Sequence, residues 1–344
     1  MIQLIHADNH LCRVYFSFFN PIFIHSCDDS SHLLSDLMIR RYLMNFQQFS
    51  TELIRQLTPM FPEDTQISTQ AIPKNNGVFL EALIIREPGI NISPTIYLED
   101  YYSLYQEGTT LNEICHIICD VFLEVRLNHP VDPRFFTDFE QAKKHMVYQL
   151  VNYDKNEARL SDVPHIRYLD LVIIFCCMLR LENGETATIL IRNEHLDLWK
   201  TDLETIKKQA FDNTPRLLPA YIQPITDAIR DLMESNESLE RLLPLLERDA
   251  APPLYVLTNE TQICGAACML YPSLLAEFAD NIGKDLYILP SSIHEVLLLP
   301  TDTRCADEEL CTLVQNINRE QLPLTQQLSD TVYFYSRAAK ALVV

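Results

Sequence analysis

The sequence LVIIFCCML, residues 171–179, is almost wholly apolar and rich in β-branched residues. Strands that are apolar on both faces lie in the interior of a sheet and are covered on both sides. We therefore expect residues 168–179 to form the central strand of a sheet. The turn sequence ENGE at 182–185 leads into a predicted partner strand at 186–191, as in a β-hairpin.

On both sides of this strand, the sequence contains segments typical of strands and segments typical of helices. Predicted strands lie at 65–72, 78–86, 91–98, 254–258, 266–271, 286–289, 295–299 and 332–335, with NNG at 75–77 as the first hairpin turn. Predicted helices lie at 44–57, 99–107, 110–128, near 194, at 202–211 (stopped before Pro215), 222–233, 274–281 and 308–317. These elements predict an α+β fold, with antiparallel or mixed sheets flanked by helices.

The elements group into four segments along the chain. Residues 1–43 form an atypical leader, which is either a mobile or mis-called extension before a natural start at Met44, or an extra element that packs on the domain. An N-terminal α/β lobe follows at 44–130, then a central α+β unit at 131–250 and a C-terminal α+β unit at 251–344. The last two units share the order strand, turn, strand, helix, which predicts two similar halves. The acidic stretch 235–251 is the candidate linker between them.

Composition restricts the function classes. The formal net charge is −20, which disfavours binding to nucleic acids and to anionic membrane surfaces. Only 6 glycines are present, and neither GxGxxG nor GxxxxGK[ST] occurs, which argues against the standard nucleotide-binding loops. No apolar stretch approaches the ~20 residues that span a bilayer. We expect no cofactor, no nucleic-acid partner, no membrane partner, and a protein as the partner if there is one.

The 10 cysteines show no CxxC spacing and no nearby histidine at zinc-finger distance. Free thiols of a reducing compartment explain them best, which predicts a cytoplasmic location.

Several strings resemble those of a known protein family. They are NISPTIYL (91–98), VPHIRYLD (163–170), NEHLDLW (193–199), NTP (213–215), YVLTN (255–259) and LPSSIHEVLL (289–298). In this order they resemble a bacterial domain of unknown function that is frequent in gut Firmicutes, over about residues 44–344. A fainter resemblance reaches a second uncharacterised cytosolic Firmicutes family. Both resemblances imply an α+β fold in the cytoplasm, and neither implies an activity.

Two short segments contain residues that could carry catalysis. The loop PSSIHE (290–295) places Ser292 and His294 between two apolar strands, and a serine, a histidine and a carboxylate are the components of nucleophilic catalysis. His165 and Asp170 flank the start of the central strand, where a carboxylate could orient an imidazole. The alternative for both segments is structural, with these side chains bonded to main-chain groups or capping turns. If His165 and His294 occupy equivalent places in two half-domains, they could converge on one cleft.

The segment Asn193, Glu194, His195 and Asp197 offers possible metal ligands near a helix start. Its spacing matches neither HExxH nor a two-histidine, one-carboxylate set. An N-cap by Asn193 is the preferred interpretation, and no metal site is predicted.

Two functions remain open. The first is a non-catalytic interaction or adaptor protein of the bacterial cytoplasm, which predicts an exposed apolar patch. The second is a hydrolase-like enzyme that uses His165, Asp170, Ser292 and His294, which predicts these side chains within reach of one another around a single pocket.

Overall fold

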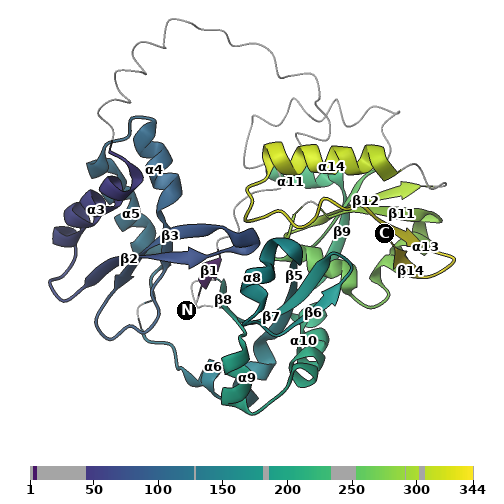
Figure 1. Ribbon diagram of the computed structural model, residues 1–344, viewed down its shortest axis with the longest axis horizontal. Coiled ribbons are helices and arrows are strands. Elements are labelled where there is room, and N and C mark those ends of the chain that lie inside the picture. The colour runs from purple at the N-terminus through teal and green to yellow at the C-terminus, as the bar shows by residue number, and fades with distance from the viewer. Residues whose placement is uncertain are drawn as a thin grey trace, which may run out of the picture.

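The computed structural model describes residues 3–5, 44–127, 129–180, 186–233, 253–290, 292–301 and 307–343. It shows the predicted α+β fold, with antiparallel sheets flanked by helices. An N-terminal lobe lies to one side of a larger body that contains two sheets (Figure 1). The predicted turn at 182–185 and the candidate linker at 235–251 lie outside the described residues.

The N-terminal lobe is a three-stranded sheet with its helices packed on one face. Its strands β2 (Gln66–Pro73), β3 (Phe79–Arg86) and β4 (Thr95–Tyr97) pair in that order. Helices α3 (Phe46–Leu57), α4 (Leu98–Gln106) and α5 (Leu111–Val125) bury one apolar side each against the sheet, with short 3-10 turns η1 (Thr58–Met60) and η2 (Asn75–Gly77). The predicted hairpin and the three helices are confirmed. The third strand is shorter than predicted because Pro94 cannot donate a ladder hydrogen bond.

The first sheet of the body has β7 (Leu171–Arg180) at its centre, as predicted. On one side β7 pairs with β5 (Met146–Asn152), and on the other with β6 (His165–Tyr168) and β8 (Thr186–Leu190). Within the predicted leader, β1 (Gln3–Ile5) pairs with β8. Helices α6 (Arg134–Thr137), α7 (Phe139–Ala142), α8 (Glu157–Leu160), α9 (Asn193–Trp199) and α10 (Leu203–Leu217) surround this sheet, with the 3-10 turns η3 (Lys143–His145) and η4 (Asp154–Asn156).

The second sheet of the body has the strand order β14-β13-β11-β12-β10-β9. Its strands are β9 (Ala220–Pro224), β10 (Tyr255–Asn259), β11 (Asp285–Leu289), β12 (Val296–Thr301), β13 (Tyr333–Ser336) and β14 (Ala341–Val343). The helices of this part are α11 (Ile225–Met233), α13 (Leu274–Ile282), α14 (Asp307–Gln321) and the 3-10 helix η6 (Gly265–Leu270). Strand β9 comes from the predicted central unit and pairs with β10 of the predicted C-terminal unit.

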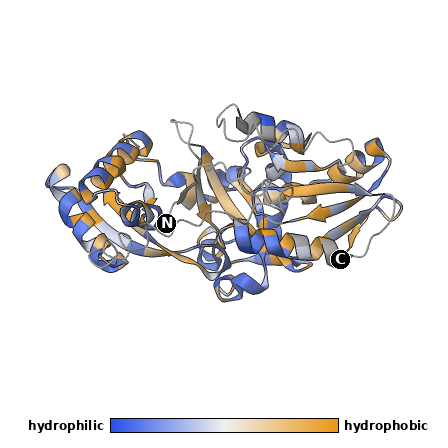
Figure 2. Ribbon diagram, turned by 90° about the horizontal axis from the view of Figure 1, so that it is seen from above, coloured by the Kyte–Doolittle hydropathy of each residue, from blue (hydrophilic) through white to orange (hydrophobic). Residues whose placement is uncertain are grey.

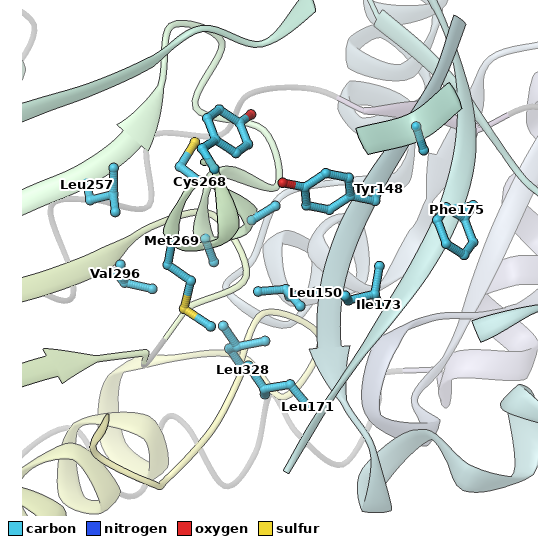
Figure 3. Packing of buried hydrophobic residues seen from close by; sticks show 14 of the residues in the cluster. Tyr148, Leu150, Leu171, Ile173, Phe175, Leu257, Cys268, Met269, Val296 and Leu328 are labelled. Carbon is cyan, nitrogen blue, oxygen red and sulfur yellow. The ribbon is translucent and has the colours of Figure 1, made fainter. Parts of the chain in front are cut away.

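The two sheets of the body share one hydrophobic core. Leu150 of β5 and Ile173 of β7 lie in the same buried cluster as Met269 of η6, Val296 of β12 and Leu328 (Figure 3). The body strands are largely hydrophobic in Figure 2, which fits their burial between covering layers. Burying this apolar surface is the main favourable term that holds the two sheets together.

Three predictions of local structure were wrong. Residues 266–271 form the 3-10 helix η6 and not a strand, so the predicted strand, turn, strand, helix order does not hold for 254–281. Residues 220–224 extend as β9 before α11 begins at Ile225. Helix α10 runs through Pro215 to Leu217. The last turn of α10 is held from outside, because Asn213 donates to the carbonyls of Lys143 and Met146.

A cluster of amide side chains, here called the asparagine clamp, fixes the N-terminal lobe to the body. Asn156 accepts a hydrogen bond from Asn76 N at 2.9 Å and donates to Asn75 Oδ1 at 2.9 Å. Asn75 and Asn76 in turn donate to main-chain carbonyls of 324–327. Asn76 has a left-handed φ of 56°, which asparagine tolerates better than most residues. The hairpin turn predicted from sequence is therefore also the docking point of the lobe.

Replacing Asn156 with alanine is expected to lower the free energy of unfolding by roughly 2–3 kcal/mol, because it leaves the backbone N–H of Asn76 without its acceptor and the side-chain oxygens of Asn75 and Asn76 without their donor. Urea unfolding followed by circular dichroism measures this loss. Asn193→Ala removes an exposed amide and should change stability by less than ~0.5 kcal/mol. Equal effects of the two substitutions would contradict a clamping role for Asn156.

Candidate functional site

Asp170 lies in the turn between β6 and β7 and bonds to the second sheet of the body. Its two carboxylate oxygens accept hydrogen bonds of 2.5 Å from Ser329 Oγ and from the Tyr333 hydroxyl. Both Ser329 and Tyr333 are fully buried. Burial raises the pKa of Tyr333, and the charge of Asp170 raises it further, so this phenol stays protonated and donates. Asp170 therefore joins the two sheets.

His165 is the first residue of β6 and is half-buried. Its Nδ1 lies 2.7 Å from the carbonyl oxygen of Val163, so Nδ1 carries the proton in this contact. Its ring lies beside that of Tyr153, with 6.4 Å between the centroids. In the neutral ring this leaves Nε2 as a proton acceptor.

Ser292 and His294 occupy the predicted loop between β11 and β12. Ser292 is buried, forms an isolated bridge with Gln327, and accepts a 3.0 Å hydrogen bond from the backbone N–H of His294. The Nδ1 atom of His294 lies 3.3 Å from the backbone nitrogen of Cys264. Ser292 thus contacts the main chain of His294, whereas a nucleophile would contact its imidazole. Ser291 lies outside the described residues.

Asp170, Ser292 and His294 are linked through one region, which we call the sheet junction, where Pro290, Ser292 and His294 meet the first sheet, whereas His165 reaches it only across β7. Ser329, the partner of Asp170, donates from its backbone N–H to the Pro290 carbonyl at 2.9 Å. Cys264, whose backbone nitrogen contacts His294, donates from its Sγ to Gln149 Oε1 at 2.8 Å. Gln149 pairs with Ile174, and Ile174 pairs with His165. Since neighbouring strands are ~4.8 Å apart, Gln149 and His165 have backbones about 10 Å apart.

The sequence did not indicate Cys264, Ser329 or Tyr333 as members of the sheet junction. Burial raises the pKa of the Cys264 thiol to about 12, with a smaller contribution from Cys176. A thiol with so high a pKa is a hydrogen-bond donor and a poor nucleophile. Gly265, directly after Cys264, was the one available signal, since a glycine among apolar residues often marks a close approach of backbones.

One protein-family model matches most of the chain. The model of a family of unknown function (DUF5688) matches residues 46–337. The chain belongs to this family. No curated protein and no solved structure matches the chain.

Among the residues that the structure describes in this DUF5688 member, no helix has the length and apolar character needed to cross a membrane. The seven cysteines of this described part are all free thiols. They are Cys115, Cys119, Cys176, Cys177, Cys264, Cys268 and Cys311.

The segment weighed as a metal site forms the start of α9. Arg192 is its N-cap, so the predicted cap by Asn193 was wrong. The imidazole Nδ1 of His195 accepts a 2.9 Å hydrogen bond from Arg192 N, and its Nε2 lies 3.6 Å from Glu194. Burial lowers the pKa of His195, which favours the neutral, accepting ring. In the described parts of the chain, no three histidine, cysteine or acidic side chains are grouped to hold a metal ion.

A cavity of about 560 Å³ opens elsewhere in the body. Its lining includes Tyr168, Phe211, Tyr271, Tyr335 and Lys340. None of the four predicted catalytic residues lines it. The cavity and the predicted catalytic residues therefore lie in different places in this family member.

Proposed function

We propose that this protein is a non-catalytic interaction protein of the bacterial cytoplasm that binds a protein partner through its N-terminal lobe. The observation that carries the proposal is where large apolar side chains are exposed. Among the described residues, five of the eight belong to this lobe: Met60, Phe79, Leu104, Ile117 and Leu123. Exposed apolar surface concentrated on one lobe is typical of an interaction site.

Met60 and Leu123 form the best-defined part of this surface. Their side chains are 40% and 55% exposed. Met60 precedes Phe61 and Leu123 follows Phe122, and these two rings pack edge to face with centroids 5.5 Å apart. The two exposed side chains are therefore sequence neighbours of one aromatic pair, of which Phe122 is buried and Phe61 partly buried. Exposed apolar residues next to a packed aromatic pair suit a protein contact, since little conformational entropy is lost on binding.

The state of the predicted catalytic residues supports a non-catalytic role. Asp170 uses both carboxylate oxygens to join the sheets, and Ser292 is buried beneath main-chain contacts. The net charge of −20 favours a partner with a basic surface around its apolar contact. The resemblance to Firmicutes proteins suggests a bacterial host for the search.

The test is capture of partners by the tagged full chain in its native host. We expect the wild type to retain a defined protein that the double variant Met60→Glu, Leu123→Glu loses. Leu198→Glu is the matched control, because Leu198 is an equally exposed leucine on α9 of the body. Retention of the same proteins by all three forms would contradict the proposal. Turnover of a small substrate that is lost in His165→Ala and His294→Ala would favour the hydrolase-like alternative.

A further inference from the structure

The cavity of about 560 Å³ in the body is lined from both of its sheets. Tyr168 of β6 and Ile173 of β7 belong to the first sheet. Tyr335 of β13 and Leu342 of β14 belong to the second. Figure 3 shows Ile173 and another lining residue, Met269 of η6, on opposite sides of the shared core. The volume lies within the range of roughly 300–1,000 Å³ that small-molecule sites occupy.

Aromatic rings form much of the cavity wall, and their neighbours hold them in place. Phe211 of α10 and Tyr271 line the cavity, and the fully buried Tyr148 packs against both. The Tyr148 ring stacks on Phe211 with centroids 4.6 Å apart and meets Tyr271 edge to face at 6.3 Å. The Tyr271 hydroxyl donates to the Leu218 carbonyl at 2.8 Å. A wall fixed in this way loses little conformational entropy on binding, and its rings favour an aromatic ligand.

The lining carries positive charge and no acid. Lys340 is its one charged residue, and among the described residues Lys340 has no ion pair. Burial raises the pKa of the lining residues Tyr168 and Tyr335, so both phenols stay neutral. This positive lining occurs in a chain whose net charge is −20. Charge complementarity therefore favours an anionic ligand over a cationic one.

The polar groups of the cavity lie on its solvent side. Lys340 and Ser273 are exposed, whereas Ile173 and Leu275 of the same lining are buried. Ser273 is the residue before α13, but its hydroxyl makes no capping hydrogen bond to that helix. The hydroxyl is thus available to donate to a ligand. An apolar interior with a few polar groups at its opening suits a ligand that has an apolar body and one charged end.

We propose that this cavity binds a small aromatic carboxylic acid, with its ring against the aromatic wall and its carboxylate at Lys340. The carboxylate accepts hydrogen bonds from the Lys340 ammonium and the Ser273 hydroxyl, and on the solvent side it keeps part of its hydration. The ring buries its apolar surface against Phe211 and Tyr271. Because the lining comes from both sheets, the bound acid also strengthens their packing.

The first test is isothermal titration calorimetry of the full chain with three ligands. We expect 1-naphthaleneacetate to bind with a Kd below about 1 mM, and the neutral 1-naphthaleneacetamide to bind roughly fivefold more weakly, because it lacks the charge. Decanoate carries the same charge on an aliphatic chain, and we expect it to bind more weakly than 1-naphthaleneacetate. Equal affinity for the acid and the amide would overturn the role of Lys340. Tighter binding of decanoate would overturn the choice of an aromatic ligand, and binding of none of the three would overturn the proposal.

The second test places the ligand in the cavity by substitution. Lys340→Gln should weaken 1-naphthaleneacetate binding roughly fivefold and leave the amide unchanged. Lys208→Gln is the matched control, because Lys208 is an exposed lysine of α10 that does not line the cavity. Ala276→Phe should block both ligands by filling the cavity, and thermal unfolding checks that this variant is folded. Equal affinity of wild type, Lys340→Gln and Lys208→Gln for the acid would contradict the proposal. Partner capture through Met60 and Leu123 is independent of these outcomes.

Discussion

Replacing Asp170 with alanine is expected to lower the free energy of unfolding by roughly 2–5 kcal/mol. The carboxylate accepts from Ser329 and Tyr333, and both donors are fully buried. Without Asp170, two hydroxyls at the interface between the sheets would lose their acceptor where water has little access. Urea unfolding of the wild type and the variant, with the slope compared as well as the midpoint, measures the loss.

Two further substitutions make this result specific. Asp170→Asn keeps one carbonyl oxygen as an acceptor, so we expect about half of the destabilisation of the alanine variant. Asp162→Ala removes an acid from the surface pair with Arg192 and should cost less than ~1 kcal/mol. If Asp170→Ala were as stable as Asp162→Ala, Asp170 would not join the sheets. It would then become available again for the catalytic role.

Replacing Gly265 with alanine is expected to cost roughly 3 kcal/mol through overpacking. A Cβ atom at this position would overlap Thr258 Oγ1 and the His294 carbonyl oxygen, and it would lie 3.0 Å from Asn259 N. Thr258 and His294 are themselves joined by a 2.8 Å hydrogen bond, so neither group can move away alone. The alanine would separate η6 from the loop that carries His294.

Gly89→Ala provides the control for this substitution. Gly89 has a φ of +79° but open space around it, so alanine there meets only backbone strain of about 1 kcal/mol. The φ of Gly265 is outside the left-handed region, so its cost is due to packing alone. Thermal unfolding of both variants tests the difference. A milder effect at Gly265 than at Gly89 would show that the sheet junction is looser than the structure indicates.

Together the two substitutions test whether the sheet junction is a structural joint. Its polar side chains bond to the main chain or to the opposite sheet, which suits an interaction protein whose body supports an exposed lobe.

The sequence alone determined the elements whose signal is local. Residues 171–179 are apolar on both faces and form the central strand β7. The NNG sequence at 75–77 marks the β2–β3 hairpin, and the helix predicted at 110–128 is α5. These features depend on periodicity, turn chemistry and capping within a few residues. The family resemblance was likewise readable from ordered short strings.

Tertiary structure alone decided which side chains meet. Asp170 bonds to partners 159 and 163 residues away, and no local pattern reports such pairs. Residues 266–271 are apolar like a strand, but they form a 3-10 helix. This helix begins at Gly265, which packs closely against Thr258 and His294. Arg159 looks ordinary in the sequence, and only the tertiary structure shows that its Nε atom is buried without a hydrogen-bond partner. The physical reason is that burial and pairing depend on groups distant in the chain, whereas the sequence signals are short-range.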